Sequence, residues 1–261
     1  MCAERISGRV GVLFVYKLMA QFFIHPQDIS NGTAKLSGGE AKHLVRVLRH
    51  RIGDHIWFSD GVSKQYEGKI ISITSHEVQF AILQTRELQK QKNPPTMAMA
   101  ILKGDRWDWA IQKVVELGCP HILPFFSTRT IPQFDEEAVE KKRIRWERIA
   151  LEAAKQSGLP QEPKVDLPKT WEELLQSFSQ YQNIVMPWEG EKKYTLQSAL
   201  ETNRSQKTLI VIGPEGGFTD EEAMMAKEKG GILVSLGSQI LRSETASIVT
   251  LALYQFTQNN I

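Results

Sequence analysis

The chain has 261 residues, of which 41% are hydrophobic and 24% charged, and its formal net charge is +2. This composition predicts a globular protein with a substantial core, excludes a disordered or collagen-like chain, and offers no run near the ~18 apolar residues of a membrane helix. The two cysteines, Cys2 and Cys119, fit neither a metal site nor a disulfide framework, which predicts a reducing compartment and a cytoplasmic location.

The first part of the chain is mostly β in pattern. Residues 1–18 precede a second methionine, Met19, and we interpret them as a possible start-site extension. HIWFSDG alternates and ends in the hairpin signal Asp60-Gly61, and YEGKIISITSHEVQFAIL predicts two further strands. We therefore expect a small β-barrel-like domain over residues 19–90, interrupted by a helix from about Gly39 to Arg49.

This first part is also the basic part. Residues 1–92 hold 13 Lys or Arg and 8 Asp or Glu, a balance of +5, whereas the rest holds 19 and 22, a balance of −3. The densest basic run, KHLVRVLRHR, is either the solvated face of an amphipathic helix or a surface that contacts nucleic-acid phosphates. On a helix Arg46 and Arg49 would share a face, and Leu44, Val47 and Leu48 would face the β domain.

A linker and an α/β domain follow. The polar stretch before Pro94-Pro95 predicts a linker at residues 91–96. Over residues 97–261 strands alternate with helices, which is typical of a parallel sheet; we expect strands in MAMAILKG, HILPFF, NIVMPW, TLIVIG and ILVSLG. Asp105 is expected to cap the first helix, and Thr170 with Glu173 has capping-box spacing for a later one.

The segment LIVIGPEGGFTDEEA, residues 209–223, indicates a ligand-binding loop between a strand and a helix. It has neither the Gly-Lys-Ser/Thr of a P-loop nor the G-x-G-x-x-G of a dinucleotide site. Gly216-Gly217 permits close backbone approach, and Thr219 with Glu222 predicts a capping box. Glu215 is a ligand-facing carboxylate, a solvated loop residue, or the partner of a nearby arginine.

Two other strands of this part end in similar segments. NIVMPWEGE ends in Pro187-Trp188-Glu189-Gly190, and ILVSLGSQILRSETAS passes from Gly237 to the last helix. Ligands of open α/β sheets bind at the carboxyl ends of the strands. The three loops could therefore form one pocket, where Leu236, Ile240 and Leu241 would suit an aromatic base.

These motifs resemble a known family. VIGPEGGFTDEE followed by LGSQILRSETASI is similar to the RsmE family of bacterial ribosomal RNA methyltransferases, which belongs to the SPOUT class. The resemblance extends over most of the chain from about Met19 and includes ILKGDRWDWAIQKVVELG and RWERIALEAAKQSG. It implies an α/β fold with a C-terminal parallel sheet containing a deep trefoil knot, and a small N-terminal PUA-like domain that binds RNA.

The resemblance also implies an activity. Members of the family transfer a methyl group from S-adenosylmethionine to N3 of a uridine in small-subunit (16S) ribosomal RNA. The resemblance further implies a homodimer whose active site is completed across the interface. The substrate is expected to be RNA within the assembled subunit. Gln21 and Leu159 stand where many family members have arginine, and both replacements remove a possible RNA contact.

The cofactor residues follow from the resemblance, and the RNA residues from the basic side chains of the two parts. Three loops would hold the cofactor, through Met186, Pro187, Trp188, Gly213, Glu215, Gly216, Gly217, Leu236, Ile240, Leu241, Arg242, Thr245 and Ala246. RNA contacts are expected from Lys42, Arg46, Arg49, Arg51 and Arg106.

The catalytic candidates are Arg242, Glu244 and Glu215. Uridine N3 must lose its proton before it attacks the methyl group, so the anion needs a cation and the proton needs an acceptor. Arg242 would stabilise the anion or orient the base, and Glu244 or Glu215 would act as proton acceptor or positioning group. Alternatively, Arg242 and Glu244 form a structural pair. No metal ion is expected.

Two other functions remain open. The chain could be a non-catalytic RNA-binding assembly factor, or a SPOUT methyltransferase that acts on another rRNA position or on ribose O2′.

Overall fold

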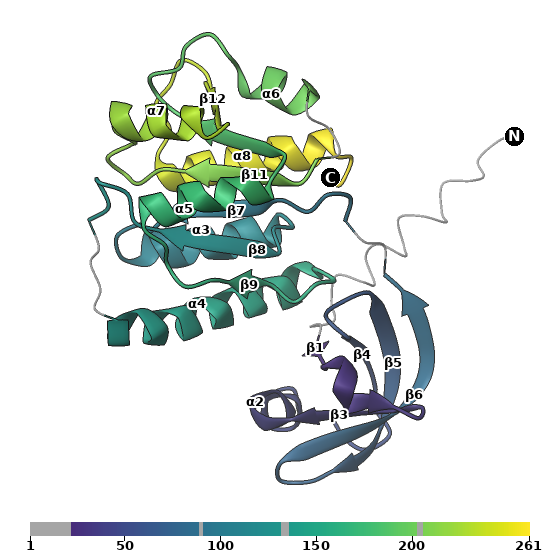
Figure 1. Ribbon diagram of the computed structural model, residues 1–261. Helices are drawn as coiled ribbons and strands as arrows, with labels where there is room; N and C mark the ends of the chain where they lie inside the picture. The colour runs from purple at the N-terminus through teal and green to yellow at the C-terminus, as the bar shows by residue number, and fades with distance from the viewer. Residues whose placement is uncertain (1–21, 89–90, 132–135, 203–205) are drawn as a thin grey trace, which may run out of the picture. The chain divides into compact units, whose positions relative to one another are not determined.

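The computed structural model describes residues 22–88, 91–131, 136–202 and 206–261 and divides into two compact units (Figure 1). The first unit takes in the described residues up to 88 together with Ala154–Glu162, and the second takes in the described parts of Gln91–Ala153 and Pro163–Ile261. The possible extension 1–18 and Gln21 lie outside the described residues. The expected boundaries 19–90, 91–96 and 97–261 stay predictions.

A curled six-stranded sheet forms the first unit, in the order β1-β4-β5-β6-β3-β2 (Figure 1). All its strand pairs are antiparallel except β1 with β4. Alternate side chains, including Phe58, Ile70 and Phe80, are buried in its core. The small β domain predicted for this part is confirmed; its strands are β1 (Phe22–Phe23), β2 (Ile29–Ser30), β3 (Thr33–Ser37), β4 (His55–Ser59), β5 (Lys64–Ile73) and β6 (Glu77–Glu87).

The helix expected from Gly39 to Arg49 is shorter. Helix α2 spans Gly38–Lys42 and continues as one π-helical turn, His43–Val47. Arg49 then takes a left-handed conformation with φ of 58°. The expected shared face of Arg46 and Arg49 is therefore wrong, because the chain leaves the helix before residue 49.

The same π-helical turn changes which side chains are buried. Leu44 is fully buried, as expected, but Val47 is 65% exposed and Leu48 is 40% exposed. The prediction that Val47 and Leu48 face the β domain is wrong. The wider π-helical turn and its early end shift both residues away from the face that α-helical spacing predicts.

The segment Ala154–Glu162 belongs to the first unit and is anchored there by polar contacts. The Lys155 ammonium lies 2.6 Å from the Glu40 carboxylate, and the Ser59 hydroxyl donates to the Pro160 carbonyl at 3.1 Å. Leu159 is only 6% exposed. At this position, where many family members have arginine, the leucine side chain therefore packs in the interior.

The second unit contains a six-stranded sheet in the order β12-β10-β11-β7-β8-β9, and all its pairs are parallel. The five predicted strands are confirmed, and a two-residue strand, β9, is added at the edge. The chain enters the sheet at the central strand β7, so the strand order reverses beside it. The strands are β7 (Thr96–Ala100), β8 (His121–Phe125), β9 (Lys164–Val165), β10 (Asn183–Pro187), β11 (Thr208–Ile212) and β12 (Ile232–Val234).

Six helices accompany this sheet among the described residues (Figure 1). Side chains of α5 and α7, such as Trp171 and Ala223, share one core cluster with the strands, whereas α8 packs against α3, α6 and β11. Cys119 is fully buried and is a small residue of the core. The helices are α3 (Asp105–Glu116), α4 (Glu136–Ser157), α5 (Trp171–Ser177), α6 (Leu196–Thr202), α7 (Asp220–Glu228) and α8 (Ser243–Thr257).

Helix starts follow the capping signals with one exception. Both predicted capping boxes, Thr170 with Glu173 and Thr219 with Glu222, are present. The expectation for Asp105 is wrong by one residue, because Gly104, with φ of 64°, precedes the helix and Asp105 is its first member. Among the described residues, none of the helices has the length and apolar character needed to cross a membrane.

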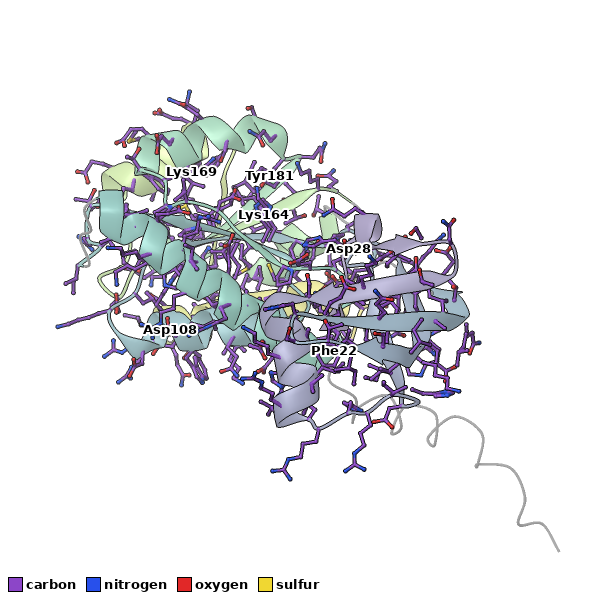
Figure 2. All side chains as sticks on the ribbon, turned by 90° about the horizontal axis from the view of Figure 1, so that it is seen from below. Phe22, Asp28, Asp108, Lys164, Lys169 and Tyr181 are labelled. Carbon is purple, nitrogen blue, oxygen red and sulfur yellow. The ribbon has the colours of Figure 1, made fainter. Side chains whose placement is uncertain are left out.

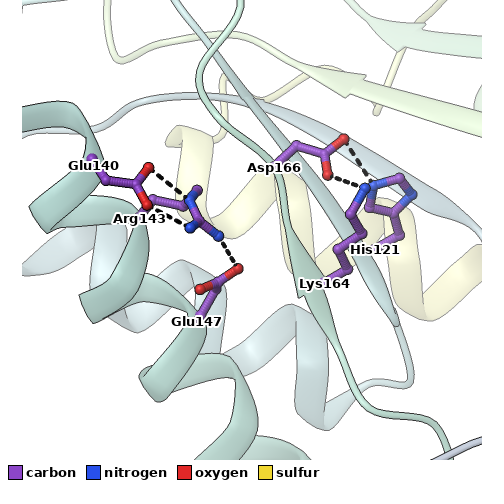
Figure 3. A network of polar contacts seen from close by, with 6 residues as sticks. All are labelled: His121, Glu140, Arg143, Glu147, Lys164 and Asp166. Atoms are coloured by element: carbon purple, nitrogen blue, oxygen red, sulfur yellow. Dashed lines mark hydrogen bonds and ion pairs between the residues drawn. The ribbon is translucent and has the colours of Figure 1, made fainter. Parts of the chain in front are cut away.

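Polar networks on the second unit lie on α4 and at the β9 edge (Figure 3). On α4, Arg143 pairs with Glu140 and Glu147. At the edge, where Figure 2 shows Lys164, the Asp166 carboxylate lies 3.1 Å from His121 and 2.6 Å from Lys164. Burial raises the pKa of Asp166, but the hydrogen bonds from His121 and Lys164 outweigh it and lower the pKa from 3.8 to about 2.

We predict that Asp166→Asn removes an acid-sensitive part of the stability. Because the pKa is lower in the folded state, the carboxylate stabilises the fold above pH 3.8, and this contribution disappears as the pH falls toward about 2. The variant should lose about 1–2 kcal/mol of unfolding free energy at neutral pH. Denaturant titrations between these pH values should show a shallower decline for the variant, whereas Glu228→Gln should behave as wild type; equal slopes for Asp166→Asn and wild type would contradict the prediction.

Candidate functional site

Two of the three loops expected at the site line one pocket of the second unit. The cavity has a volume of about 90 Å³ and lies between the loop after β10 and the loop after β12. Its apolar lining consists of Pro187, Trp188, Leu236, Ile240, Leu241 and Ala246, and its polar lining includes Glu189, Glu191 and Lys192. Six of the expected cofactor residues are therefore brought together.

Trp188 is held in place by the strands beside it. Its backbone N–H donates to the Val234 carbonyl of β12 at 3.0 Å, and its ring packs against the core cluster. The ring also covers Gly190, where a Cβ atom would lie 2.2 Å from it. A side chain at residue 190 would displace this wall of the pocket.

The GPEGG loop, residues 213–217, lies beside the pocket and does not contribute to its lining. The Gly217 N–H donates to the Pro214 carbonyl at 3.0 Å, and Gly217 has φ of 69°. A Cβ atom on Gly217 would lie 2.5 Å from a carboxylate oxygen of Glu189. The loop therefore meets the pocket at Gly217. At the start of the loop, a Cβ atom on Gly213 would lie 2.8 Å from the Phe218 ring.

Glu215 is paired at one of its two oxygens. That oxygen accepts the Lys103 N–H at 3.0 Å and lies 3.6 Å from the Arg106 guanidinium. The other oxygen is buried and has no hydrogen-bond partner among the described residues. The arginine-pair interpretation of Glu215 thus matches the geometry, and the expected RNA contact Arg106 is its partner.

Arg242 and Glu244 stand at the start of α8. Arg242 is the N-cap residue, its side chain is exposed, and its carbonyl accepts the Ala246 N–H at 2.8 Å. One carboxylate oxygen of Glu244 is buried without a hydrogen-bond partner in the described part of the chain. No ion pair joins these two residues among those described, so the alternative of a structural pair is not observed.

Two further expected cofactor residues lie outside the pocket lining, in addition to Arg242 and the four in the GPEGG loop. Met186 is fully buried in the core of β10, and Thr245 is exposed on the first turn of α8. Met186 supports the strand that carries Trp188.

The loop after β8 is tied to the GPEGG loop by residues that sequence reasoning missed. The Glu222 carboxylate, 3% exposed, accepts the Thr219 N–H at 2.9 Å with one oxygen and the Thr128 N–H at 2.8 Å with the other. Arg129 donates to the Gly216 carbonyl at 2.8 Å. Capping-box spacing indicated the first bond, but no sequence signal pointed to Thr128 or Arg129.

The expected RNA residues of the first unit are all exposed. Lys42 lies at the end of α2, Arg46 lies in the π-helical turn, and Arg49 and Arg51 follow it. Val47 and Ile52, 65% and 64% exposed, lie within the same stretch. No group of three or more metal-binding side chains occurs among the described residues.

Comparisons with known proteins define the class of protein. A family model described as RNA methyltransferase domain matches residues 89–255, and one described as RNA methyltransferase PUA domain matches residues 36–83. The ribosomal RNA small subunit methyltransferase E of Bacillus subtilis (strain 168) is 32% identical over 243 residues, which cover 90% of this chain and 95% of the relative. That of Mesomycoplasma hyopneumoniae (strain 232) is 39% identical over 160 residues, covering 61% and 68%.

Solved structures agree with these matches. The ribosomal RNA small subunit methyltransferase E from Neisseria gonorrhoeae, bound to S-adenosyl methionine, has a TM-score of 0.76 and 29% identity, covering 91% of this chain and 97% of the other. A methyltransferase from Legionella pneumophila in complex with S-adenosylmethionine has a TM-score of 0.80 and 26% identity, with the same coverage.

The chain is thus an RNA methyltransferase with an N-terminal PUA domain. Within that class it belongs to the ribosomal RNA small subunit methyltransferase E family. The family and the two-part α/β fold expected from the sequence are confirmed, while the trefoil knot stays a prediction.

We predict that Glu222→Gln weakens the contact between the loop after β8 and the GPEGG loop. A glutamine side chain has one acceptor oxygen, so its NH₂ group must face one of the two backbone N–H groups. The variant should lose about 1–3 kcal/mol of unfolding free energy.

The matched control is Glu173→Gln, since Glu173 caps α5 in the same way, with a bond to the Thr170 N–H at 2.8 Å and no second loop attached. Its loss should stay below about 1 kcal/mol. Equal losses in the two variants, measured by denaturant titration, would show that the Thr128 bond contributes nothing.

Proposed function

We propose that this protein transfers a methyl group from S-adenosylmethionine to N3 of a uridine in small-subunit ribosomal RNA. The observation that supports this most is the apolar pocket between the loops after β10 and β12, in a chain of this methyltransferase family. The proposed substrate is RNA within the assembled subunit.

The residues at the pocket suit this cofactor. Trp188, Leu236 and Ile240 offer apolar surface for an adenine ring. Where the two loops meet, the Glu189 carboxylate lies next to the backbone of Gly217, which has a positive φ. When bound, the cofactor supplies an electrophilic methyl group; the residues proposed to hold it are those of the three loops from Met186 to Ala246.

The protein's own groups would manage the charge and the proton of the base. Removing the N3 proton leaves an anion spread over two carbonyl oxygens, and the exposed Arg242 guanidinium at the start of α8 would stabilise it. The proton would pass to a carboxylate or a water held by one. Glu215 and Glu244 remain the candidates, because each has a buried oxygen without a partner among the described residues.

RNA contacts are proposed on both units. In the first unit Lys42, Arg46, Arg49 and Arg51 supply exposed positive charge close together in the chain. In the second unit Arg106, 52% exposed, lies at the GPEGG loop beside Glu215.

We also propose a homodimer formed through α6 and α8. A second cavity is lined by apolar side chains that include Leu196, Val249 and Leu253, and Leu253 is 47% exposed. Residues Ser235–Ser238 line this cavity and the candidate cofactor pocket alike. A second copy seated there would extend a pocket that is small beside the ~300–1,000 Å³ of typical ligand sites.

The dimer is tested by Leu253→Asp. A buried charge without a partner would destabilise the interface, so sedimentation velocity should find wild type as a dimer and the variant as a monomer. Leu167→Asp, a substitution at a 51% exposed leucine elsewhere on the second unit, should remain dimeric. A monomeric wild type, or a dimeric Leu253→Asp variant, would contradict the proposal.

The alternatives differ in measurable ways. A non-catalytic assembly factor would bind ribosomal RNA but not S-adenosylmethionine, so calorimetric titration with the cofactor separates it from the enzyme. A methyltransferase acting on another position or on ribose O2′ would bind the cofactor and differ only in its product. A cytoplasmic location stays a prediction.

We predict that Arg242→Ala lowers the turnover number by about 10²-fold or more while changing cofactor affinity little. The reason is that the proposed charge on the base exists only as the N3 proton leaves. Single-turnover methyl transfer and cofactor titration measure the two quantities separately. Arg145→Ala, which removes a 56% exposed arginine paired with Asp108, is the control and should match wild type; an unchanged rate in Arg242→Ala would remove that residue from the mechanism.

A further inference from the structure

The candidate pocket contains one carboxylate whose role is not explained by the fold. Three ionisable side chains line it, Glu189, Glu191 and Lys192. The Glu191 carboxylate accepts the Lys193 N–H at 2.7 Å and the Tyr194 N–H at 3.0 Å, so it shapes its own loop. Glu189 is exposed, and within the described part of the chain its carboxylate has no hydrogen-bond or ion-pair partner.

Glu189 lies where two loops of the second unit meet. Its two carboxylate oxygens lie 2.5 and 2.8 Å from the point where a Cβ atom of Gly217 would stand. The loops after β10 and β11 therefore meet at this carboxylate, which lies close to the backbone of Gly217. Gly217 also has φ of 69°, which disfavours any other residue.

Glu189 also follows directly on the apolar wall of the pocket. Trp188 precedes it in the chain, and Leu236 and Ile240 line the same cavity. An adenine ring in this apolar part would lie next to the carboxylate, and our proposal places the group joined to the ring on that side. In an adenosine that group is the ribose, with hydroxyl groups on two neighbouring carbons.

We propose that the Glu189 carboxylate binds the ribose hydroxyl groups of the cofactor. An ionised carboxylate only accepts hydrogen bonds, and its two oxygens match the two O–H donors of a vicinal diol. Acidic side chains hold ribose hydroxyls in this way in dinucleotide-binding folds. The inference rests on the proposed cofactor, and it assigns Glu189 to binding rather than to the chemical step.

A second ligand group could also attract this carboxylate, the α-ammonium of the methionine part. 5′-Methylthioadenosine separates the two, because it keeps adenine and ribose but lacks the amino acid and the sulfonium charge. S-Adenosylhomocysteine carries the amino acid as well. A loss of affinity shared by both ligands therefore reports on the ribose.

The test is calorimetric binding of both ligands to the full chain, comparing wild type with Glu189→Gln. We expect the variant to bind each ligand about tenfold more weakly, the loss typical of a hydrogen bond to a charged group. 5′-Methylthio-2′-deoxyadenosine should bind wild type more weakly than its parent but should lose little further in the variant. Glu172→Gln, which changes an exposed glutamate on α5, is the control and should match wild type.

The possible results have distinct meanings. Equal affinities of wild type and Glu189→Gln for both ligands would overturn the inference while leaving the proposed function in place. A loss confined to S-adenosylhomocysteine would also overturn it, in favour of the ammonium group. If wild type binds none of the ligands, the proposed cofactor itself is wrong.

Discussion

The Glu222 carboxylate accepts a backbone N–H group from each of two loops, Thr219 at 2.9 Å and Thr128 at 2.8 Å, and the carboxyl edge of the second sheet is arranged around these two bonds. The Glu222 side chain is 3% exposed, and burying a carboxylate costs free energy unless its oxygens accept hydrogen bonds. Here both do, and the start of α7 adds favourable helix-dipole charge. The GPEGG loop enters α7 through Thr219, so this carboxylate fixes the far end of that loop.

The strand order decides what the fixed loop can reach. Strand β11 lies between β7 and β10, so the loop at its carboxyl end has neighbours on both sides. Toward β7 it meets Lys103 and Arg106 through Glu215, and toward β10 it meets Glu189 at Gly217. The pocket itself opens between the loops of β10 and β12, one strand further along. The pocket thus lies at the carboxyl ends of the strands, where open α/β sheets bind ligands.

How far the sequence predicts this arrangement depends on the range of the interaction. Local signals predicted the elements well. Capping-box spacing located the starts of α5 and α7. Alternating apolar residues located strands of the first unit, and apolar runs located those of the second. The exposed Val47 and the left-handed Arg49 were missed because a π-helical turn has no clear sequence pattern. The Thr128 bond to Glu222 joins residues 94 positions apart, and the contact of Glu189 with Gly217 joins two loops, so neither can be found by spacing alone. The strand ends indicated the loops of the pocket, the family resemblance named the cofactor, and the structure supplied the contacts between the loops.

The central claim is that this chain methylates N3 of a uridine in small-subunit ribosomal RNA. The most direct measurement is methyl transfer from isotopically labelled S-adenosylmethionine to small ribosomal subunits from cells that lack the activity, followed by nuclease digestion and mass mapping of the labelled nucleotide. The account predicts label on a single uridine, at N3 of the base. Absence of transfer to these subunits, or label on ribose or on another base, would contradict it.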